Sequence, residues 1–484
     1  MSVNASLLLS MRIFFLSLAI FISVFSHAQL CTGSLGDPVV NITFGSGVAG
    51  NTAFAAPGYI YTSSSCPNDG YYTITSSTSG CFNSTWLTVN SDHTGNGAFM
   101  LVNASLQPAD FFVSTVTGLC PNTTYEFSAW ILNVLKSFTG IQPNITFTIE
   151  TPSGAILNTY NTGNISVTPQ PVWKQYGFYF TTSAVNADVV LRIRNNAPGG
   201  VGNDLALDDI TFRPCGPVLN SVINGNGNKV DVCSYDQTDY FFSSVISPGF
   251  ISPVFQWQIS NDSGTTWKDI SGANNFTYQR KPTGAGNYWY RQTVAENGNA
   301  GISSCRIGSN VLNINVHPKP AINAGPDRIV IIGGHITLVA TINGGNNVYS
   351  WSPPDFLSSA SILNPVASPD KDMLYSLNAV SEYGCINQDQ VLIKVVAGIF
   401  VPTAFTPNND GKNDSWTIPY LDPLLNAQVN LYNRYGQLVY QVSGATVEWN
   451  GTWKGVPQPS GTFVYFIHFK DGTPDMKGTI NLIR

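Results

Sequence analysis

Two adjacent carboxylates, Asp208 and Asp209, are the residues of this chain whose type and spacing most suggest chemistry. They lie in a largely apolar run, 205–212, whose composition is typical of a β-strand. Successive side chains of a strand face opposite sides, so Asp209 should share a face with Leu207 and Asp208 with Ile210. Both faces are apolar. We therefore expect at least one carboxylate to point inward, where an unpaired charge is costly.

A bound Ca²⁺ would satisfy such a charge, because this ion takes oxygen ligands from carboxylates, amides and backbone carbonyls. Nearby oxygens are available at Asp92 and Asn96. We expect a structural calcium site formed by Asp92, Asn96, Asp208 and Asp209. The alternative is that loop amides satisfy the carboxylates without a metal.

Motifs for catalysis are scarce. The chain has 5 His, and it contains no His-x-x-Glu-His zinc motif, no Gly-x-Ser-x-Gly elbow and no P-loop. Paired glycosidase carboxylates lie far apart in sequence, so a polysaccharide hydrolase stays open as an alternative. Our prediction is that the protein is not an enzyme and has no catalytic residues.

Aromatic residues in a loop-rich stretch suggest a site for sugar instead. Sugars bind on exposed aromatic planes that have amide and carboxylate partners beside them, and Asn and Asp are frequent in this stretch. The candidate ligand-binding residues are Tyr59, Tyr61, Tyr71, Tyr72 and Trp86. The alternative is that these rings fill the core of a β-sandwich.

The elements that must position these residues are β-strands. With 44 Gly and 29 Pro, the chain should turn often and form no long helices. Short alternating runs such as 145–149 and 173–180 recur along it, which indicates an all-β fold of tandem β-sandwich modules. Only 10% of residues are charged and the net charge is −6, which argues against nucleic acid as a partner.

The N-terminus is typical of an exported protein. Arg12 precedes the apolar run 13–25, and Ser26-His27-Ala28 supplies a small-x-small cleavage pattern, so residues 1–28 are predicted to be a signal peptide. No later run has the roughly 18 apolar residues of a membrane span, and we expect none in the mature chain. Export also permits disulfides.

The first predicted module, 29–217, resembles carbohydrate-binding jelly rolls of the galactose-binding-like and MAM families. The resemblance rests on the closing motif Leu205-Ala206-Leu207-Asp208-Asp209-Ile210 and on the loop and strand at 92–100. It implies a glycan as ligand and a structural calcium near Asp209.

Two further modules are predicted to extend the chain. Residues 218–317 are similar to an Ig-like domain, with Trp257 as its core tryptophan and Tyr290 where an antibody-type domain has its second cysteine. Residues 318–397 resemble PKD-type or Ig-like repeats of bacterial surface proteins, on the runs 349–353 and 391–396. We expect both to act as spacers.

The last predicted module, 398–484, resembles the gliding motility-associated C-terminal domain, the type B sorting domain of the Bacteroidetes type IX secretion system. The resemblance rests on ordered motifs at 401–414, 429–436, 449–452, 459–465 and 477–484. It implies that an outer-membrane machine reads a folded surface on this module. The residues that match the motifs, and that we expect to carry the sorting signal, are Phe405, Pro407, Asn408, Asp410, Gly411, Asn413, Asp414, Arg434, Gly436, Trp449, Gly451, Gly461 and Tyr465.

The run 408–414 allows a second interpretation. Its alternating oxygen side chains are similar to a calcium loop, but Lys412 stands at a ligand position and no bidentate Glu follows. We favour a network of Asx turns, in which these side chains cap their own backbone.

The chain has 8 Cys. Cys31 with Cys215 would tie the ends of the first module together, and Cys66 with Cys81 would form a local bridge. Cys233 and Cys305 bracket the second module and are expected to form a disulfide. Cys120 is left unassigned, and Cys385 is either a free thiol or part of an unusual pair, because connectivity cannot be deduced from sequence.

These observations predict a non-enzymatic protein that is secreted or displayed on the surface of a gliding-type bacterium. Its N-terminal jelly roll would bind an extracellular glycan or surface protein, and its last module would engage the type IX secretion machinery. The alternatives are a structural adhesin without glycan binding and, less favoured, a polysaccharide hydrolase.

Overall fold

The computed structural model describes residues 30–45, 55–78, 80–95, 97–136, 139–184, 188–396, 398–419, 421, 427–444, 446–470 and 474–484. The expected signal peptide, 1–28, and the candidate ligand Asn96 lie outside these residues. Within them, helix is limited to the short turns α1 (Cys81–Ser84) and η1 (Ser303–Cys305). Everything else that is regular is β-strand, which confirms the predicted all-β fold class.

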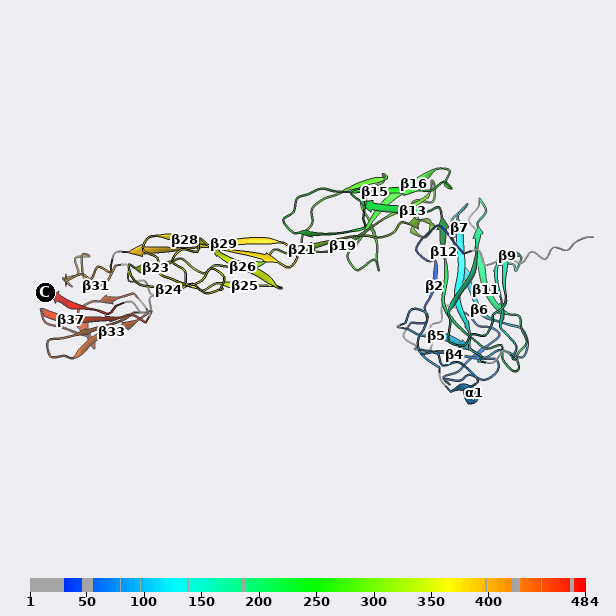
Figure 1. The fold of residues 1–484 in the computed structure, drawn as a ribbon, viewed down its shortest axis with the longest axis horizontal. Helices are drawn as coiled ribbons and strands as arrows, with labels where there is room; N and C mark the ends of the chain where they lie inside the picture. The colour runs from blue at the N-terminus through cyan, green and yellow to red at the C-terminus, as the bar shows by residue number, and fades with distance from the viewer. Residues whose placement is uncertain are drawn as a thin grey trace, which may run out of the picture.

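The strands form four units along an elongated molecule, with the head unit at one end and the C-terminus at the other (Figure 1). The head unit has an eight-stranded sheet, in which β10-β7-β12-β5-β4-β3 is the main path and β1 and β2 pair with β12. A four-stranded sheet, β6-β11-β8-β9, lies against it. The bounds are β1 (Ser34–Leu35), β2 (Val40–Ile42), β3 (Ile60–Tyr61), β4 (Tyr71–Thr75), β5 (Phe99–Val102), β6 (Ala109–Val116), β7 (Thr124–Asn133), β8 (Asn144–Glu150), β9 (Ile156–Asn164), β10 (Lys174–Thr181), β11 (Val189–Asn195) and β12 (Leu205–Gly216).

The larger sheet of the head is buried on both faces at one end. Ile131 and Leu205 belong to the main core between the two sheets. Their chain neighbours Leu132 and Ala206 belong to a second, smaller core that also holds Trp86. Since neighbouring side chains of a strand face opposite sides, the second core lies on the outer face of the larger sheet. It fixes the segment around α1 against that face.

The second unit is a β-sandwich of a three-stranded sheet, β13-β15-β18, and a six-stranded sheet, β14-β21-β19-β16-β17, with β20 paired to β19. Trp257 is fully buried in its core beside Tyr290. The bounds are β13 (Leu219–Ile223), β14 (Lys229–Cys233), β15 (Tyr240–Ile246), β16 (Pro253–Ser260), β17 (Lys268–Asp269), β18 (Thr277–Arg280), β19 (Gly286–Glu296), β20 (Ile307–Gly308) and β21 (Leu312–His317).

The third unit repeats this plan in a smaller form, around the sheet β23-β29-β28-β26 and the pairs β22-β25 and β24-β27. In both units an early strand pairs in parallel with the last one, β14 with β21 and β23 with β29. The bounds are β22 (Ala321–Asn323), β23 (Arg328–Ile331), β24 (Ile336–Thr337), β25 (Thr341–Asn343), β26 (Asn347–Ser352), β27 (Val366–Ala367), β28 (Met373–Ser381) and β29 (Ile386–Val396). The module boundaries and the PKD-type assignment stay predictions.

The C-terminal unit has the sheet β30-β38-β37-β32-β33 and the pairs β31-β34 and β35-β36. Its core holds Trp416 and Trp449 together with alternating residues of β32 and β37. The bounds are β30 (Ala404–Phe405), β31 (Trp416–Thr417), β32 (Gln428–Tyr432), β33 (Leu438–Ser443), β34 (Glu448–Trp449), β35 (Thr452–Trp453), β36 (Val456–Pro457), β37 (Gly461–His468) and β38 (Met476–Leu482).

All eight cysteines form disulfides. The pairs Cys31–Cys215 and Cys66–Cys81 are those expected. The expected pair Cys233–Cys305 is wrong, since Cys305 bonds to Cys120 of the head and Cys233 bonds to Cys385 of the third unit. The reason is position: Cys305 lies in η1, which faces the head, and Cys233 ends β14 at the opposite end of its unit, beside the third unit.

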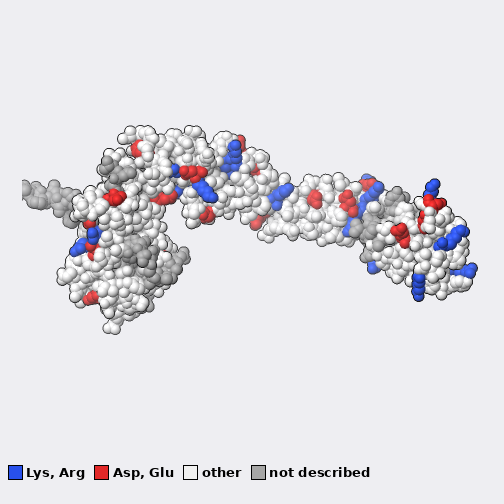
Figure 2. All heavy atoms as spheres, turned by 180° about the vertical axis from the view of Figure 1, so that it is seen from behind, with Lys and Arg blue, Asp and Glu red and all other residues white. Residues whose placement is uncertain are grey.

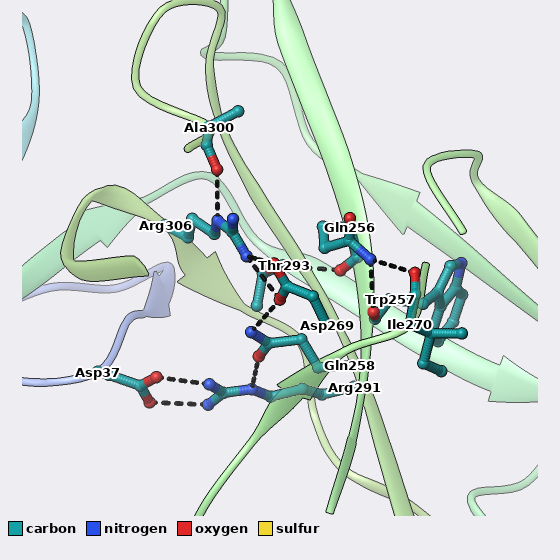
Figure 3. A network of polar contacts seen from close by, with 10 residues as sticks. All are labelled: Asp37, Gln256, Trp257, Gln258, Asp269, Ile270, Arg291, Thr293, Ala300 and Arg306. Carbon is teal, nitrogen blue, oxygen red and sulfur yellow. Dashed lines mark hydrogen bonds and ion pairs between the residues drawn. The ribbon is translucent and has the colours of Figure 1, made fainter. Parts of the chain in front are cut away.

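Polar contacts accompany the disulfide between the head and the second unit. Arg291 on β19 donates from both terminal nitrogens to the carboxylate of Asp37, at 2.8 Å for Nη1, and from Nε to Gln258 (Figure 3). Gln258 in turn donates to Asp269, which also accepts from Arg306 at 2.8 Å. The side chains of Arg291 and Arg306 are only 11% and 9% exposed, whereas those of Asp37 and Asp269 are 48% and 44% exposed, so the network lies at the edge of the junction.

Candidate functional site

The paired carboxylates of β12 sit at a β-bulge. The pairing of β12 with β7 shifts register between Asp208 and Thr211, and Asp209 has a φ of 45°, in the left-handed region. Leu207 and Ile210 consequently face the same core. The expectation that these two residues lie on opposite faces, each sharing its face with one carboxylate, is wrong because the bulge interrupts the alternation.

Backbone amides and a histidine partner these carboxylates. Asp208 is fully buried and accepts N–H groups from His93 at 3.0 Å and from Asp209 at 2.8 Å. Asp209 lies 2.7 Å from Nδ1 of His93, whose ring stacks on Trp130 at 3.6 Å. Burial, aided by the negative charges of Asp209 and Asp92, raises the pKa of Asp208 to about 7.

Asp92 makes similar contacts. Its carboxylate accepts from the hydroxyl of Thr94 and from the backbone N–H of Gly95, both at 2.6 Å. Across the described ranges, no group of three or more His, Cys, Asp or Glu is arranged to hold a metal ion. The carboxylates therefore already have loop partners, which is the arrangement of the metal-free alternative, and the calcium site stays a prediction.

The five aromatic residues singled out in the sequence do not form one exposed face. Tyr59 is 7% exposed and belongs to the main core, and Trp86 is 2% exposed. Tyr61 on β3 is 39% exposed and packs edge-to-face on Tyr72 of β4. Tyr71 precedes Tyr72 on β4, so its side chain faces the other side of the sheet edge.

Trp86 does line a pocket, which we call the head pocket. It has a volume of about 250 Å³. Its lining is Asp69, Phe82, Thr85, Trp86, Asn103, Leu135, Thr139, Gly140, Gly200, Val201, Gly202 and Asp204. The ring of Phe82 is 42% exposed and lies 4.9 Å from that of Trp86 between centroids. The pocket thus combines an accessible aromatic ring with carboxylate, amide and hydroxyl groups.

Asp204 is the buried acid of the head pocket. Its carboxylate accepts from the indole N–H of Trp86 at 3.1 Å and from the backbone N–H of Ala104 at 3.2 Å. Burial is the main cause that raises its pKa to about 7, and the negative charge of Asp69 adds to the effect. Near neutral pH this group can therefore either accept or donate a hydrogen bond.

Local sequence explains why the pocket forms. The disulfide Cys66–Cys81 joins the segment before β4 to α1, where Phe82, Asn83 and Ser84 all have positive φ. On the opposite wall, a Cβ on Gly202 would lie 2.6 Å from the carbonyl oxygen of Ile141, so glycine is required for the two loops to meet.

Of the pocket residues, only Trp86 was predicted to bind a ligand. Asp69 and Asp204 were missed because they come from segments that only the fold brings beside Trp86. Phe82 was also missed, although it lies four positions before Trp86. Two features of the sequence could have pointed to this pocket: the local disulfide Cys66–Cys81 and the run of glycines that precedes β12.

In the C-terminal unit, most of the predicted sorting residues hold the fold. Phe405 and Trp449 are 2% exposed and pack on each other, and a Cβ on Gly451 would lie 2.6 Å from Leu482. Tyr465 packs against Trp416 in the same core. Three further sorting residues shape the backbone. Pro407 directly precedes the loop 408–414, Gly436 has a φ of 74° in a turn, and Gly461 begins β37.

The loop 408–414 is a network of side-chain caps on backbone N–H groups. Asp414 accepts from Asn409 at 2.6 Å and from Gly411 at 2.8 Å, and Asp410 accepts from Lys412 at 2.8 Å. Asn408 donates to Asp410. The carbonyl of Asn413 accepts from Thr406 and closes the loop. These carboxylates are used by the loop's own backbone, as an Asx-turn network requires.

Among the predicted sorting residues, Arg434 is exposed and projects from the β32–β33 turn. Its guanidinium lies 4.8 Å from the ring centre of Tyr435, which is 72% exposed. On the face that Figure 2 shows, most of the surface is uncharged, and lysine and arginine side chains stand out around the end of the C-terminal unit.

The described residues include no helix of the length and apolarity needed to cross a membrane. Two families match parts of the chain. Residues 399–482 match the CHU_C Type IX secretion signal domain, and residues 224–318 match a domain of unknown function, DUF8696. No curated protein matches.

Solved structures resemble the chain remotely. The CBM22-1 xylan-binding domain of Paenibacillus barcinonensis Xyn10C is 14% identical, with a TM-score of 0.26, and the match covers 38% of this chain and 97% of that one. Fibronectin(III)-like modules of Clostridium thermocellum CbhA are 16% identical, with a TM-score of 0.18, over 36% and 93%. A Ca²⁺-stabilized, ice-binding adhesin of an Antarctic bacterium is 10% identical, with a TM-score of 0.18, over 77% and 99%.

Likenesses this remote say nothing about a ligand. The informative match is that of the C-terminal unit, which covers nearly all of it and agrees with the resemblance seen in the sequence. The chain carries a type IX secretion signal domain at its C-terminal end, and this signal indicates export to the cell surface or the medium.

Proposed function

We propose that this is a non-enzymatic surface or secreted protein that binds a glycan through the head pocket after type IX export. The observation that supports it is the composition of the pocket: the exposed ring of Phe82 stands beside Trp86, with Asp69, Asp204 and Asn103 around it. A sugar ring offers an apolar face for such an aromatic plane and hydroxyl groups for the exposed carboxylate of Asp69, while Asp204 and Asn103 are buried and bonded within the wall of the pocket.

The second and third units would hold this pocket away from the surface to which the C-terminal unit delivers the protein. The disulfides at both junctions support this role, because they keep the head unit and the next two units in one arrangement. The proposed structural calcium would lie at Asp208 and Asp209. Calorimetry of Ca²⁺ binding tests it, and absence of heat together with an unchanged Tm in chelator would remove the metal.

The binding proposal is tested with the full mature chain on a glycan array, followed by titration of the best binder. Phe82→Ala should weaken binding about 10-fold, a loss of about 1.4 kcal/mol, because it removes the exposed aromatic plane of the pocket. Phe241→Ala is the matched control, because that ring is 52% exposed on β15 of the second unit, outside the pocket.

Two outcomes would favour the alternatives. If no glycan binds, the head is a structural adhesin or contacts a protein. If Phe82→Ala binds the glycan as the wild type does, the glycan site lies outside the head pocket and the pocket assignment fails. Turnover of a polysaccharide by the full chain would instead identify a hydrolase. For export, deletion of residues 398–484 should trap the protein in the periplasm, and its unchanged appearance outside the cell would refute the secretion role.

A further inference from the structure

The C-terminal unit contains a second pocket, which we call the C-terminal pocket. Its volume is about 370 Å³, and it lies where the β32–β33 turn meets the entry to β37. Its lining is Asn433, Arg434, Tyr435, Gln458, Pro459, Ser460, Gly461, Thr462 and Phe463. The lining includes no acidic residue and one fixed positive charge.

One wall of this pocket is a rigid turn. The side-chain oxygen of Asn433 accepts N–H groups from Tyr435 and Gln437, both at 3.0 Å. Gly436 closes the turn with a φ of 74° and donates to the carbonyl of Asn433 at 2.9 Å. Arg434 and Tyr435 are therefore held at the mouth of the pocket before any partner arrives.

The opposite wall is also fixed. Arg484 donates from Nε to the carbonyl of Gln458 and from its backbone N–H to Oγ of Ser460, both at 3.0 Å. The backbone N–H of Gln458 donates to Gly451 at 2.9 Å. Phe463, which is 4% exposed, belongs to the core and forms the floor.

The guanidinium of Arg434 has unused hydrogen-bonding capacity. It donates once, to the hydroxyl of Tyr435 at 2.7 Å, and within the described part of the chain no carboxylate lies within ion-pair distance of it. A guanidinium has five N–H donors in a fork that matches a carboxylate. The guanidinium lies 4.8 Å from the ring centre of Tyr435, which is the same residue whose hydroxyl it bonds.

We propose that the C-terminal pocket receives an acidic side chain from a peptide segment of the secretion machinery, with Arg434 as the group that pairs with it. The proposal rests on the export role proposed above. An acidic peptide fits because the lining carries no acidic residue and one guanidinium that pairs with no carboxylate of the described residues, and the unit that holds the pocket is the one that matches a type IX secretion signal domain. The ring of Tyr435 beside it, 72% exposed, offers contact area for the neighbouring residues of a peptide.

Binding is tested with the full mature chain and a fluorescein-labelled, glutamate-rich peptide, by fluorescence anisotropy at low and at physiological salt. Arg434→Gln should weaken binding at least 5-fold. Lys454→Gln is the matched control, since Lys454 is a surface cation of the same unit that lies over Trp453, outside the pocket lining. Tyr435→Phe, which removes only the hydroxyl that orients Arg434, should have a smaller effect. Circular dichroism melting confirms that each variant is folded.

Three results would overturn the proposal: equal binding by Arg434→Gln and wild type, an equal loss in Lys454→Gln, or tighter binding of an anionic oligosaccharide than of the peptide. Export in a strain with type IX secretion separates this proposal from the broader one. If deletion of 398–484 leaves export intact, the export role fails. If that deletion abolishes export while Arg434→Gln is exported normally, only the role of the C-terminal pocket fails.

Discussion

The junctions of this molecule are of two kinds. The head unit is bonded to the second unit by Cys120–Cys305, and the second unit to the third by Cys233–Cys385. Between the third unit and the C-terminal unit, no disulfide, ion pair or hydrogen bond joins the described residues of 321–396 to those of 399–484. The main contact there is Ile331, which packs against the C-terminal core.

This difference separates two tasks. Covalent junctions fix the direction in which the head pocket points, as a binding module on a spacer requires. The C-terminal unit is joined without such bonds, so we expect its orientation to be less strictly fixed by the units before it. The three preceding units should therefore behave as one body, and the C-terminal unit as another.

The largest expected effect comes from removing one covalent junction. Cys233→Ser with Cys385→Ser opens a loop of 152 residues, whose closure contributes about 5 kcal/mol on the chain-entropy account. We expect a lower Tm for the second and third units and a broader distribution of maximum dimensions in small-angle X-ray scattering.

The contacts that remain at this junction are weaker. Tyr235 accepts the backbone N–H of Ile386 at 3.0 Å, and His317 stacks on Tyr383 at 3.6 Å. If the double variant keeps the wild-type scattering profile and Tm, these contacts suffice and the covalent junction is not what fixes the arrangement. The Cys66–Cys81 bridge is the control, since its loss changes the head unit alone.

The sequence predicted the strands and core residues within each unit better than the disulfides between units. Alternating apolar residues identified the strands, because burial follows from local pattern. Trp257, expected as the core tryptophan of the second unit, is fully buried there. The disulfide partners of Cys120 and Cys385 could not be predicted from such a local pattern. A disulfide between units depends on which loops face each other across a junction, and no local pattern encodes that.

The same limit applies to the candidate sites. Trp86 was singled out as an aromatic residue among loops, but the residues around it come from segments up to 118 positions away, as the bond from Trp86 to Asp204 shows. At β12, a single bulge at Asp209 changed the faces of the residues that follow it. The motifs located the C-terminal unit, which matches a type IX secretion signal domain, yet they do not distinguish core residues such as Trp449 from exposed ones such as Arg434.

A glycine substitution tests the independence of the C-terminal unit. Gly451 has a φ of 75°, and a Cβ there would lie 2.6 Å from Leu482. Gly451→Ala should destabilise this unit by about 3 kcal/mol, from the left-handed backbone and the clash together. Gly455, at φ 76° with nothing within 4 Å, is the matched control and should lose only about 1 kcal/mol.

Calorimetry of the full chain is the measurement. If the units melt separately, Gly451→Ala lowers the Tm of the C-terminal unit and leaves the Tm of the three disulfide-linked units unchanged. A parallel fall of all transitions would show instead that the C-terminal unit is thermodynamically coupled to the rest, contrary to the contrast between the junctions.

The stability of the three disulfide-linked units should depend on pH. Asp204 and Asp208 of the head both have a pKa near 7 in the folded chain, against 3.8 for an unperturbed carboxyl. The folded state therefore binds their protons more tightly than the unfolded state does. Stability should rise as the pH falls from 8 to 5, by about 2 kcal/mol for each group, and should be lost again as the pH rises through 7.

Thermal melts at pH 5, 6, 7 and 8 measure this dependence, in buffer with chelator so that the proposed Ca²⁺ does not compete with the proton on Asp208. Asp208→Asn keeps the shape of the side chain and should reduce the pH dependence of the head transition while the C-terminal transition is unaffected. Near Asp208 the other titratable groups are Asp92, His93 and Asp209, so the same melts with Asp209→Asn show how much of the effect belongs to the neighbouring charge. A flat profile in the wild type would contradict the assignment.

The smallest effect concerns the polar network beside Cys120–Cys305. Arg291 is bonded to Asp37 of the head and also lies 4.3 Å from the ring centre of Trp267, so Arg291→Gln should cost about 1–2 kcal/mol. The exposed pair Lys229–Asp231, at 3.8 Å, is the control, and Lys229→Gln should change stability by about 0.5 kcal/mol or less. A double-mutant cycle with Asp37→Asn isolates the pair. A coupling near zero would mean that the disulfide alone defines this junction, because the ion pair would then only follow an arrangement that the covalent bond imposes.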